Sequence, residues 1–296
     1  MITGKTKLLG VIGYPVEHSL SPLMHNAAIK AINNQKNQQN LIDYVYLPFP
    51  IKPEDLTTAI AGFSAIGVQG FSITIPHKQA IIPLLSEVSD IAEAVGAVNT
   101  VYKIDKGWAG TNTDVTGFLA PLKTYNWDWH QKVAVILGNG GAARAVVAGC
   151  AELGLAEIHV VGRSEDKLRA FQQSWLNSPL PVNITIHKWD NLSSLITKAD
   201  LLVNTTPVGM YPNIQEYPVD EAMFDNLSRG AIVYDLIYIP NPTKFIQQAQ
   251  ERGAIAIDGL EMLVQQGAAA LELWLKESVP VDVMRRSLRE HLGLTD

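Results

Sequence analysis

Apolar residues recur along the chain in short runs that alternate with stretches of helical spacing. The first run is closed by Gly13, and a stretch with helical spacing of apolar residues then starts at Ser21-Pro22. Continued along the chain, this pattern predicts strands at 8–13, 44–47 and 70–75, and helices at 21–32, 53–66 and from Pro76 onward. Strands separated by helices are typical of a mostly parallel α/β sheet.

A second series of strands and helices follows the tryptophans at 127 and 129. It predicts strands at 132–137, 157–161, 184–187, 199–204, 231–236 and 254–257, and helices at 142–153, 166–175 and 243–252. Before it, an Asp-Lys-Gly turn predicts a hairpin of 98–103 and 107–110. Two α/β units are therefore expected, joined near 112–122. The last two expected helices, 260–276 and 281–291, can pack on either unit by pattern alone.

Composition excludes several classes of protein. The chain has 296 residues, enough for two domains, with 47% hydrophobic and 18% charged residues, which excludes a disordered chain. The net charge is −6 and the chain has no long basic run that could bind the phosphate backbone of a nucleic acid. No nucleic acid partner is therefore expected. The single cysteine, Cys150, excludes an internal disulfide and a thiolate metal cage, and we expect no metal.

Neither a signal peptide nor a membrane span is visible in the sequence. The first ten residues lack an apolar core, and the longest uncharged stretch, 56–77, is interrupted by glycine and proline and predicts helix, turn and strand. We therefore expect a cytoplasmic protein without a membrane partner.

A cluster of glycines lies between an expected buried strand and an expected helix. The spacing of Gly138, Gly140 and Ala143 fits the G-x-G-x-x-G/A form, in which missing side chains let a pyrophosphate approach a helix N-terminus. The alternative is a plain turn between strand and helix. The order of strand, loop, helix and next strand favours a Rossmann-type dinucleotide site.

The strand after this loop ends at Arg163, where an NAD-preferring fold presents an acid to the ribose 2′-hydroxyl. A guanidinium binds phosphate through paired hydrogen bonds, so Arg163 predicts NADP, with Ser164 and Lys167 as further phosphate contacts. Glu165 and Asp166 follow closely, and the alternative is that Arg163 is a solvated loop charge.

Two segments of the first unit carry candidate chemistry. Ser19 and Ser21 follow a strand, where their hydroxyls can bind a polyol or a carboxylate or, equally, serve as helix N-caps. The segment from Thr74 to Lys78 runs from a strand into a Pro-initiated helix, so the helix dipole disfavours an ammonium on Lys78. Such a lysine can pass a proton to a reacting oxygen, although an exposed first-turn lysine is the commoner case.

Asn99 and Asp114 follow successive extended segments of the first unit. Asx residues in turns are usually local caps. If Asp114 lies beside Lys78, however, the pair can hold one charge and pass one proton next to a nicotinamide.

Seven motifs, in family order, resemble shikimate dehydrogenase of the AroE type. They are Ser-Leu-Ser-Pro, Thr-Ile-Pro-His-Lys, Gly-Ala-Val-Asn-Thr, Asn-Thr-Asp, Gly-Asn-Gly-Gly-Ala, Asn-Thr-Thr-Pro-Val-Gly-Met at 204–210 and Asp-Gly-Leu-Glu-Met-Leu-Val-Gln-Gln at 258–266. The resemblance implies NADPH-dependent, reversible reduction of 3-dehydroshikimate to shikimate, in the biosynthesis of chorismate and the aromatic amino acids.

The same resemblance implies the domain organisation. Residues 1–113 and 259–296 would form the α/β substrate-binding and catalytic domain. Residues 114–258 would form a Rossmann-type NADP domain with a doubly wound parallel sheet. The last helices would pack back on the first domain, and the protein would be a monomer or a homodimer.

The resemblance also assigns roles to single residues. Lys78 and Asp114 correspond to the catalytic pair, with Lys78 supplying a proton to the oxygen as hydride reaches the ketone. Substrate would be bound by Ser19, Ser21, Thr74, Lys78, Asn99, Asp114, Tyr238 and Gln266. Cofactor would be bound by Gly138, Asn139, Gly140, Gly141, Ala142, Arg163, Ser164, Lys167, Thr205, Leu236, Gly259 and Met262.

The chain departs from the family pattern at three of these regions. Ser72 stands where Asn is frequent, which bears on any polar contact made there. Asn139 replaces a common Ala in the glycine loop. Gly162 stands where Asn is usual before Arg163, which bears on the adenosine contact.

Other functions stay open at this point. The nearest is a quinate/shikimate dehydrogenase that uses NAD or NADP, against which Arg163 argues. A Tyr-x-x-x-Lys match at 102–106 suggests a short-chain dehydrogenase, but it precedes the glycine loop and lies in the expected hairpin. A methylenetetrahydrofolate dehydrogenase would not explain Ser-Leu-Ser-Pro or Asn-Thr-Asp. A ligand-sensing regulator without turnover would not need both Lys78 and Asp114.

Overall fold

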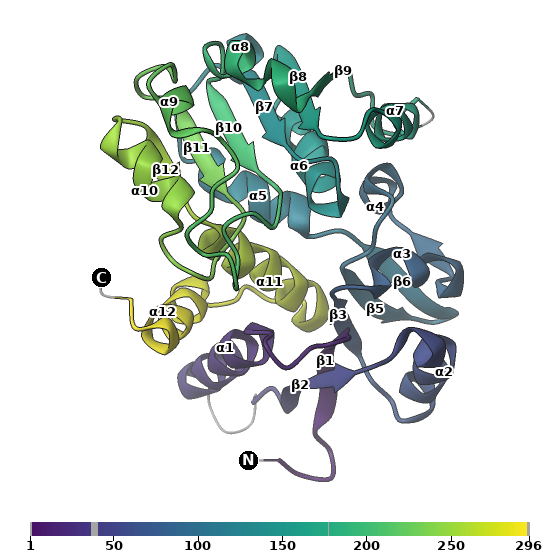
Figure 1. Cartoon of the computed structure of the whole chain (residues 1–296). Helices are drawn as coiled ribbons and strands as arrows, with labels where there is room; N and C mark the ends of the chain where they lie inside the picture. Colours follow the sequence, from purple (N-terminus) through teal and green to yellow (C-terminus); the bar gives the residue numbers. More distant parts are fainter. Residues whose placement is uncertain (1, 37–40, 177, 295–296) are drawn as a thin grey trace. The chain divides into compact units, whose positions relative to one another are not determined.

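The structure, a computed structural model, describes residues 2–36, 41–176 and 178–294. It divides into two compact units, which we call the first unit (Met1–Gly117 with Val264–Asp296) and the second unit (Phe118–Leu263). The divisions fall inside α5 (Asp114–Leu122) and α11 (Gly259–Leu275) (Figure 1). The domain limits expected from the sequence coincide with the first residues of these two helices. The assignment of substrate binding to one unit and cofactor binding to the other stays a prediction.

The first unit contains a mixed sheet with strand order β2-β1-β3-β5-β6-β4. Its strands are β1 Lys7–Gly13, β2 Tyr44–Pro50, β3 Gly70–Ile73, β4 Glu87–Val88, β5 Thr100–Ile104 and β6 Gly107–Thr111. Strand β1 is parallel to β2 and β3, whereas β5 is antiparallel to β3 and β6. The hairpin predicted around the Asp-Lys-Gly turn is therefore confirmed as β5 and β6.

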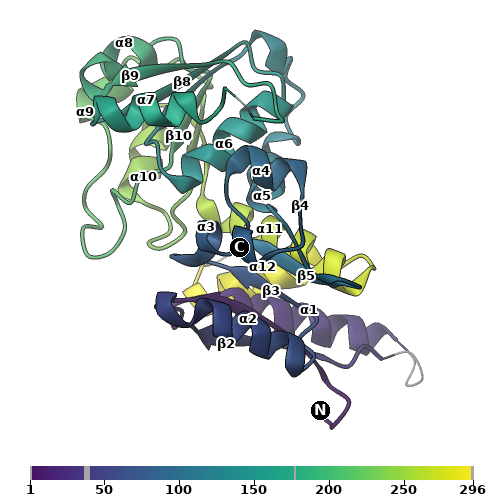
Figure 2. The ribbon, with the colours of Figure 1, turned by 90° about the vertical axis from the view of Figure 1, so that its right-hand side faces the viewer.

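Helices cover both faces of this sheet (Figure 1, Figure 2). They are α1 Ser21–Gln35, α2 Leu56–Ala65 after the 3-10 turn Pro53–Asp55, α3 His77–Ala80 before the 3-10 turn Ile82–Leu84, α4 Asp90–Val95, and α12 Val281–Leu292. Ile60 and Phe63 of α2 pack on the face that carries Phe71. The opposite face carries Tyr46, whose ring contacts Trp274 of α11. Helix α12 packs on α1, so the C-terminal helix belongs to the first unit.

The second unit contains a parallel sheet with strand order β12-β11-β10-β7-β8-β9. Its elements are β7 Val133–Leu137, α6 Gly141–Glu152, β8 Glu157–Gly162, α7 Glu165–Gln173, β9 Ile184–Lys188, α8 Leu192–Ile196, β10 Leu201–Asn204, α9 Glu221–Phe224, β11 Ile232–Asp235, α10 Lys244–Glu251 and β12 Ile255–Ile257, with the 3-10 turns Trp129–Gln131 and Trp189–Asn191. This is the doubly wound Rossmann order, with its switch point between β7 and β10. The predicted fold class is confirmed.

Candidate active site

Lys78 and Asp114 meet in the first unit. Lys78 lies in the first turn of α3, Asp114 is the first residue of α5, and Lys78 Nζ donates a hydrogen bond of 2.6 Å to Asp114 Oδ2. The two side chains remain 33% and 17% exposed, so a ligand can reach the amine. The pairing that the sequence left conditional is therefore present.

The backbone around Lys78 is fixed from both sides. Its carbonyl accepts a hydrogen bond from the Val98 amide at 2.8 Å, and the buried His77 ring bonds the Ile51 carbonyl at 2.7 Å. Helix α3 spans only His77–Ala80, so its dipole is small. The adjacent carboxylate of Asp114, not the helix dipole, is therefore the largest charge acting on the amine.

Asn99 organises the acidic side of this pair. Its Nδ2 donates to Asp114 Oδ1 at 2.8 Å and to Thr113 Oγ1 at 3.0 Å, with a weaker contact of 3.4 Å to Gln266 Oε1. Its Oδ1 accepts from the Thr113 amide at 2.7 Å and from Thr100 Oγ1 at 3.0 Å. Asn99 is only 2% exposed, so these bonds orient Asp114 rigidly.

The expectation that Asx residues act as local caps holds for one neighbour of this network. Asn112 Oδ1 accepts a hydrogen bond from the Asp114 amide at 3.0 Å and so supports the start of α5. The structure thus brings Lys78, Asn99, Asp114 and Gln266 together in the first unit. Whether Asn99 and Gln266 bind substrate directly stays a prediction.

Ser19 and Ser21 lie at the entrance of α1. The residue at the N-cap position is Leu20, without a side-chain cap, and Ser21 is the first helical residue. The N-cap alternative for Ser21 is therefore wrong. Ser19 Oγ accepts a hydrogen bond of 3.4 Å from the Ser21 amide. Nearby, Gly13 makes room for Thr74, because a Cβ on Gly13 would lie 2.4 Å from Thr74 Cγ2.

Ser72, the first departure from the family pattern, makes a polar contact of its own. Tyr46 Oη donates a hydrogen bond of 2.8 Å to Ser72 Oγ, and both side chains are buried. The serine at this departure is therefore already engaged by a tyrosine hydroxyl of the neighbouring part of the fold.

The glycine loop follows β7 at the switch point of the second sheet. Gly138 has φ +104, and a Cβ there would lie 2.7 Å from Thr205 Oγ1, which itself donates to the Leu137 carbonyl at 2.7 Å. On Gly140 and Gly141, in contrast, an added Cβ would meet no described atom within 4 Å beyond its chain neighbours. The first glycine is required by the fold, whereas the next two leave open space at the start of α6.

The other two departures from the family pattern are in contact with each other. A Cβ placed on Gly162 would lie 3.0 Å from Asn139 Oδ1 and 3.0 Å from a methyl group of Leu168. The longer side chain at Asn139 therefore uses the space that a side chain at position 162 would take.

The phosphate candidates surround the start of α7. Arg163 and Lys167 are exposed, and neither side chain has an ion-pair partner among the described residues. Ser164 caps the helix by accepting from the Lys167 amide at 3.4 Å. Glu165 is engaged by Lys188 and then Arg169, which hold the pKa of its carboxyl below its ordinary value. Its charge is thus already balanced and does not oppose an anion at Arg163.

The remaining candidates lie in the second unit after β11 and at the start of α11. Leu236 and Tyr238 follow β11, and Gly259 and Met262 belong to the first turn of α11. Gly259 permits the close approach of these segments, because a Cβ there would lie 2.2 Å from the Leu236 carbonyl oxygen. Tyr238, expected to bind substrate, therefore belongs to a different unit from the other substrate candidates.

Sequence reasoning missed a buried polar network at the ends of β10 and β11. Asp235 accepts hydrogen bonds from Asn204 Nδ2 at 3.0 Å, the Ile237 amide at 3.1 Å and Thr243 Oγ1 at 2.6 Å. Burial raises the pKa of Asp235 to about 6, against these hydrogen bonds. The available signal was an amide and an acid that each end an apolar strand.

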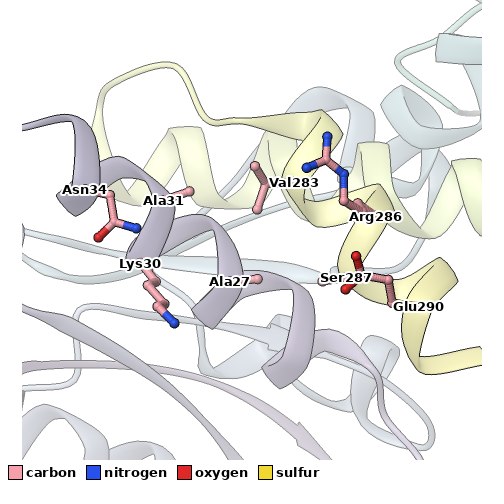
Figure 3. Close-up of a pocket in the computed structure, with 8 residues that line it drawn as sticks. All are labelled: Ala27, Lys30, Ala31, Asn34, Val283, Arg286, Ser287 and Glu290. Atoms are coloured by element: carbon pink, nitrogen blue, oxygen red, sulfur yellow. The ribbon is translucent and has the colours of Figure 1, made fainter.

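A cavity of about 250 Å³ lies between α1 and α12 (Figure 3). Its lining is Ala27, Lys30, Ala31, Asn34, Val283, Arg286, Ser287 and Glu290, which includes no candidate site residue. Across residues 2–36, 41–176 and 178–294 no helix is long and apolar enough to cross a membrane. The described part of the chain also holds no group of three His, Cys, Asp or Glu suited to a metal ion.

Family comparisons cover nearly the whole chain. "Shikimate dehydrogenase substrate binding domain" matches residues 11–101, "Shikimate / quinate 5-dehydrogenase" matches 121–263, and "Shikimate 5'-dehydrogenase C-terminal domain" matches 259–289. A protein of Trichormus variabilis named "Shikimate dehydrogenase (NADP(+))" is 64% identical over 296 residues, which cover 99% of this chain and 100% of that protein.

Solved structures agree with these matches. A shikimate dehydrogenase in complex with NADP+ is 36% identical, with a TM-score of 0.86 over 99% of this chain and 98% of that one. A shikimate 5-dehydrogenase of Listeria monocytogenes, in complex with shikimate and NAD, is 34% identical, with a TM-score of 0.85 over 97% and 98% of the two chains. The chain therefore belongs to the shikimate dehydrogenase family.

Proposed function

We propose that the protein catalyses the NADP(H)-dependent, reversible reduction of 3-dehydroshikimate to shikimate, a step in the biosynthesis of chorismate and the aromatic amino acids. The observation that carries this proposal is the hydrogen bond of 2.6 Å between Lys78 and Asp114, held by Asn99 within a polar network of the first unit. The name of the relative at 64% identity, which includes NADP(+), and the NADP+ bound in the solved relative at 36% identity support the same reaction.

The residues of the second unit fit a dinucleotide phosphate. The open space at Gly140 and Gly141 admits a pyrophosphate against the N-terminus of α6. Arg163 and Lys167 supply unpaired cations for a 2′-phosphate, with the Ser164 hydroxyl beside them. Asn139, Ala142, Thr205, Leu236, Gly259 and Met262 would complete the site. When bound, NADPH supplies the hydride for the reaction.

Lys78 handles the proton of the reaction. In the reductive direction its ammonium donates a proton to the carbonyl oxygen that becomes the hydroxyl, and the amine regains a proton from solvent afterwards. Asp114 stabilises the ammonium and accepts a hydrogen bond from a neighbouring substrate hydroxyl. In the oxidative direction the neutral amine takes the hydroxyl proton instead.

Substrate recognition uses the remaining polar side chains. Ser19 and Ser21 donate to the carboxylate, while Thr74, Asn99 and Gln266 bind ring hydroxyls as donors or acceptors. Tyr238, which belongs to the second unit, is a further candidate for binding the substrate. In this assignment the first unit binds substrate and the second unit binds cofactor.

A cytoplasmic location and a monomeric or homodimeric state complete the proposal. The free, buried thiol of Cys150 is compatible with a reducing compartment.

A quinate/shikimate dehydrogenase that also accepts NAD is the second candidate. It is favoured by the family match to "Shikimate / quinate 5-dehydrogenase" and by the solved Listeria monocytogenes relative with NAD. The unpaired guanidinium of Arg163 favours NADP over NAD, because a 2′-phosphate would neutralise it.

The test is a spectrophotometric assay of nicotinamide reduction with shikimate or quinate and with NADP+ or NAD+. We expect the highest kcat/KM with shikimate and NADP+. Absence of reduction with both cofactors would refute the dehydrogenase assignment, and equal efficiency with NAD+ or with quinate would favour the second candidate.

A further inference from the structure

A chain of hydroxyls lies beside the proposed substrate ligands of the first unit. Tyr46 of β2 is fully buried, and its hydroxyl donates to Ser72 Oγ on β3 at 2.8 Å. The Ser21 hydroxyl, at the start of α1, neighbours the same phenol and partly offsets the rise that burial causes in its pKa. One tyrosine thus links the helix that carries Ser21 to the strand that leads to Thr74.

Contacts on three sides fix Tyr46. Its ring stacks on His25 at 4.1 Å between centroids and contacts Trp274 at 5.9 Å. Its backbone lies on edge strand β2, where the N–H and C=O would otherwise lack partners, and both bind the carboxamide of Asn26 at 3.0 and 2.8 Å. His25, Asn26 and Ser21 belong to the first turns of α1, so the phenol and this helix are held as one body.

The hydroxyl chain has one hydrogen to offer outside itself. Tyr46 and Ser72 carry one hydroxyl hydrogen each, and the bond between them uses one of the two. Because Tyr46 donates to Ser72, the spare hydrogen is on Ser72, and polarisation along the chain strengthens it as a donor. Burial raises the pKa of Tyr46 above its ordinary value, so the phenol stays protonated and keeps this direction.

The polar groups around Tyr46 differ in chemistry from those around Lys78. Lys78, Asp114 and Asn99 present donors and acceptors together, which suits ring hydroxyls. The serines next to Tyr46 present hydroxyl donors. Such donors suit a group that only accepts hydrogen bonds, and a carboxylate is such a group.

We propose that Tyr46 is a positioning residue for the substrate carboxylate. It holds the Ser72 hydroxyl in a fixed orientation through their hydrogen bond, and its ring stacks on His25 of the helix that carries Ser21. Little rotational freedom is therefore lost when the carboxylate binds. The inference rests on the proposed function and adds to it a residue that does not touch the substrate.

The test compares wild type with Tyr46→Phe, which removes the hydroxyl and keeps the stacked ring. Steady-state kcat and KM are measured at saturating NADP+ for shikimate and for its methyl ester, which lacks the negative charge. We expect the KM for shikimate to rise about tenfold, because the Ser72 hydroxyl that binds the charged group loses its fixed orientation, with kcat little changed. The KM for the ester should stay near its wild-type value.

Two further variants complete the design. Ser72→Ala should raise the KM for shikimate selectively as well, and Tyr46→Phe should add little in that background, because the two residues act through one chain. Tyr234→Phe is the matched control, since Tyr234 is a buried tyrosine of the second unit whose hydroxyl has no hydrogen-bond partner among the described residues. It should leave both KM values unchanged.

The outcomes separate the inference from the function. An unchanged shikimate KM in Tyr46→Phe, or an equal rise for acid and ester, would overturn the positioning role while wild-type turnover still supports the proposed function. A wild type that does not reduce NADP+ with shikimate would overturn both.

Discussion

The proposed chemistry depends on three side chains that hydrogen bonds join in a row, Lys78, Asp114 and Asn99. Lys78 donates to one oxygen of Asp114, and Asn99 donates to the other. Because each carboxylate oxygen has its own donor, a single substitution can remove the proton carrier without removing the other groups proposed to bind substrate.

Lys78→Ala should lower kcat by about 100-fold to 10,000-fold, the range for loss of a positioned general acid or base, with a much smaller change in shikimate affinity. Steady-state kinetics and calorimetric titration with shikimate measure the two effects. Lys103→Ala, an exposed lysine of β5, is the control and should behave as wild type. Equal turnover in Lys78→Ala would contradict the assigned role.

Arg163→Ala should weaken NADP+ binding by about tenfold to a hundredfold and leave NAD+ binding nearly unchanged, because a charge-assisted phosphate contact is lost. The ratio of kcat/KM for the two cofactors is the measurement. Arg169→Ala removes a neighbouring guanidinium that is already paired with Glu165 and serves as the control. An unchanged cofactor ratio in Arg163→Ala would exclude the 2′-phosphate assignment.

Single residues differed in how far the sequence could predict them. Lys78 and Asp114 were predicted because each sits in a motif with a chemical reason for its residue type. Tyr46 was not, because its hydroxyl partner Ser72 is 26 positions away and an aromatic residue in a strand indicates only a core position. Asp235 was missed for the same reason, since its partners Asn204 and Thr243 approach it only when the sheet has formed.

Helices and strands were predicted well where the spacing of apolar residues and the positions of glycines indicated the same element boundaries. The parallel strands, the hairpin and the helices α1, α6 and α12 lie close to their expected positions. Helix α5 was not predicted, because Asp114–Leu122 includes Gly117 and Pro121, which disfavour a helix by local propensity. Burial of Phe118 and Leu119 at its centre overrides that propensity.

The glycine loop gives a prediction that separates folding from binding. Gly138→Ala should lower the free energy of unfolding by about 1–3 kcal/mol, because alanine is strained at φ +104 and its Cβ would lie 2.7 Å from Thr205 Oγ1. Gly140→Ala should leave stability nearly unchanged, since φ is −89 and the Cβ enters open space.

Gly140→Ala should change the affinity for the cofactor although it leaves stability nearly unchanged. Gly140→Ala should still raise the KM for NADP+, because its methyl group fills the space proposed for the pyrophosphate. Thermal denaturation and cofactor titration on both variants are the measurements. Wild-type NADP+ affinity in Gly140→Ala would argue that the loop is only a turn.

At the scale of the whole chain, each unit contains a buried group with a shifted pKa, and the two groups link stability to pH in opposite directions. In the first unit, burial lowers the pKa of His25 to about 3, and neither ring nitrogen has a hydrogen-bond partner among the described residues. Stability linked to His25 is present above its ordinary pKa of 6.5 and is lost as pH falls toward 3. In the second unit, the pKa of Asp235 is raised to about 6, so its stability is present below 3.8 and is lost as pH rises through 6.

Acidification from about pH 6 to about pH 4 should therefore destabilise the first unit and stabilise the second, each by about 1.4 kcal/mol per pH unit for the group concerned. Hydrogen exchange, corrected for its intrinsic pH dependence and read separately for peptides of α1 and of β10 and β11, measures both changes. His25→Phe and Asp235→Asn should each abolish the trend in their own unit only. The same slope in both units would contradict the assignment.

The most direct test of the account is a crystal structure of the protein with shikimate bound. The account predicts that a ring hydroxyl lies within hydrogen-bond distance of both Lys78 Nζ and Asp114, with the carboxylate on the Ser19 and Ser21 hydroxyls. Shikimate bound away from this pair, or bound with its carboxylate on Lys78, would contradict it.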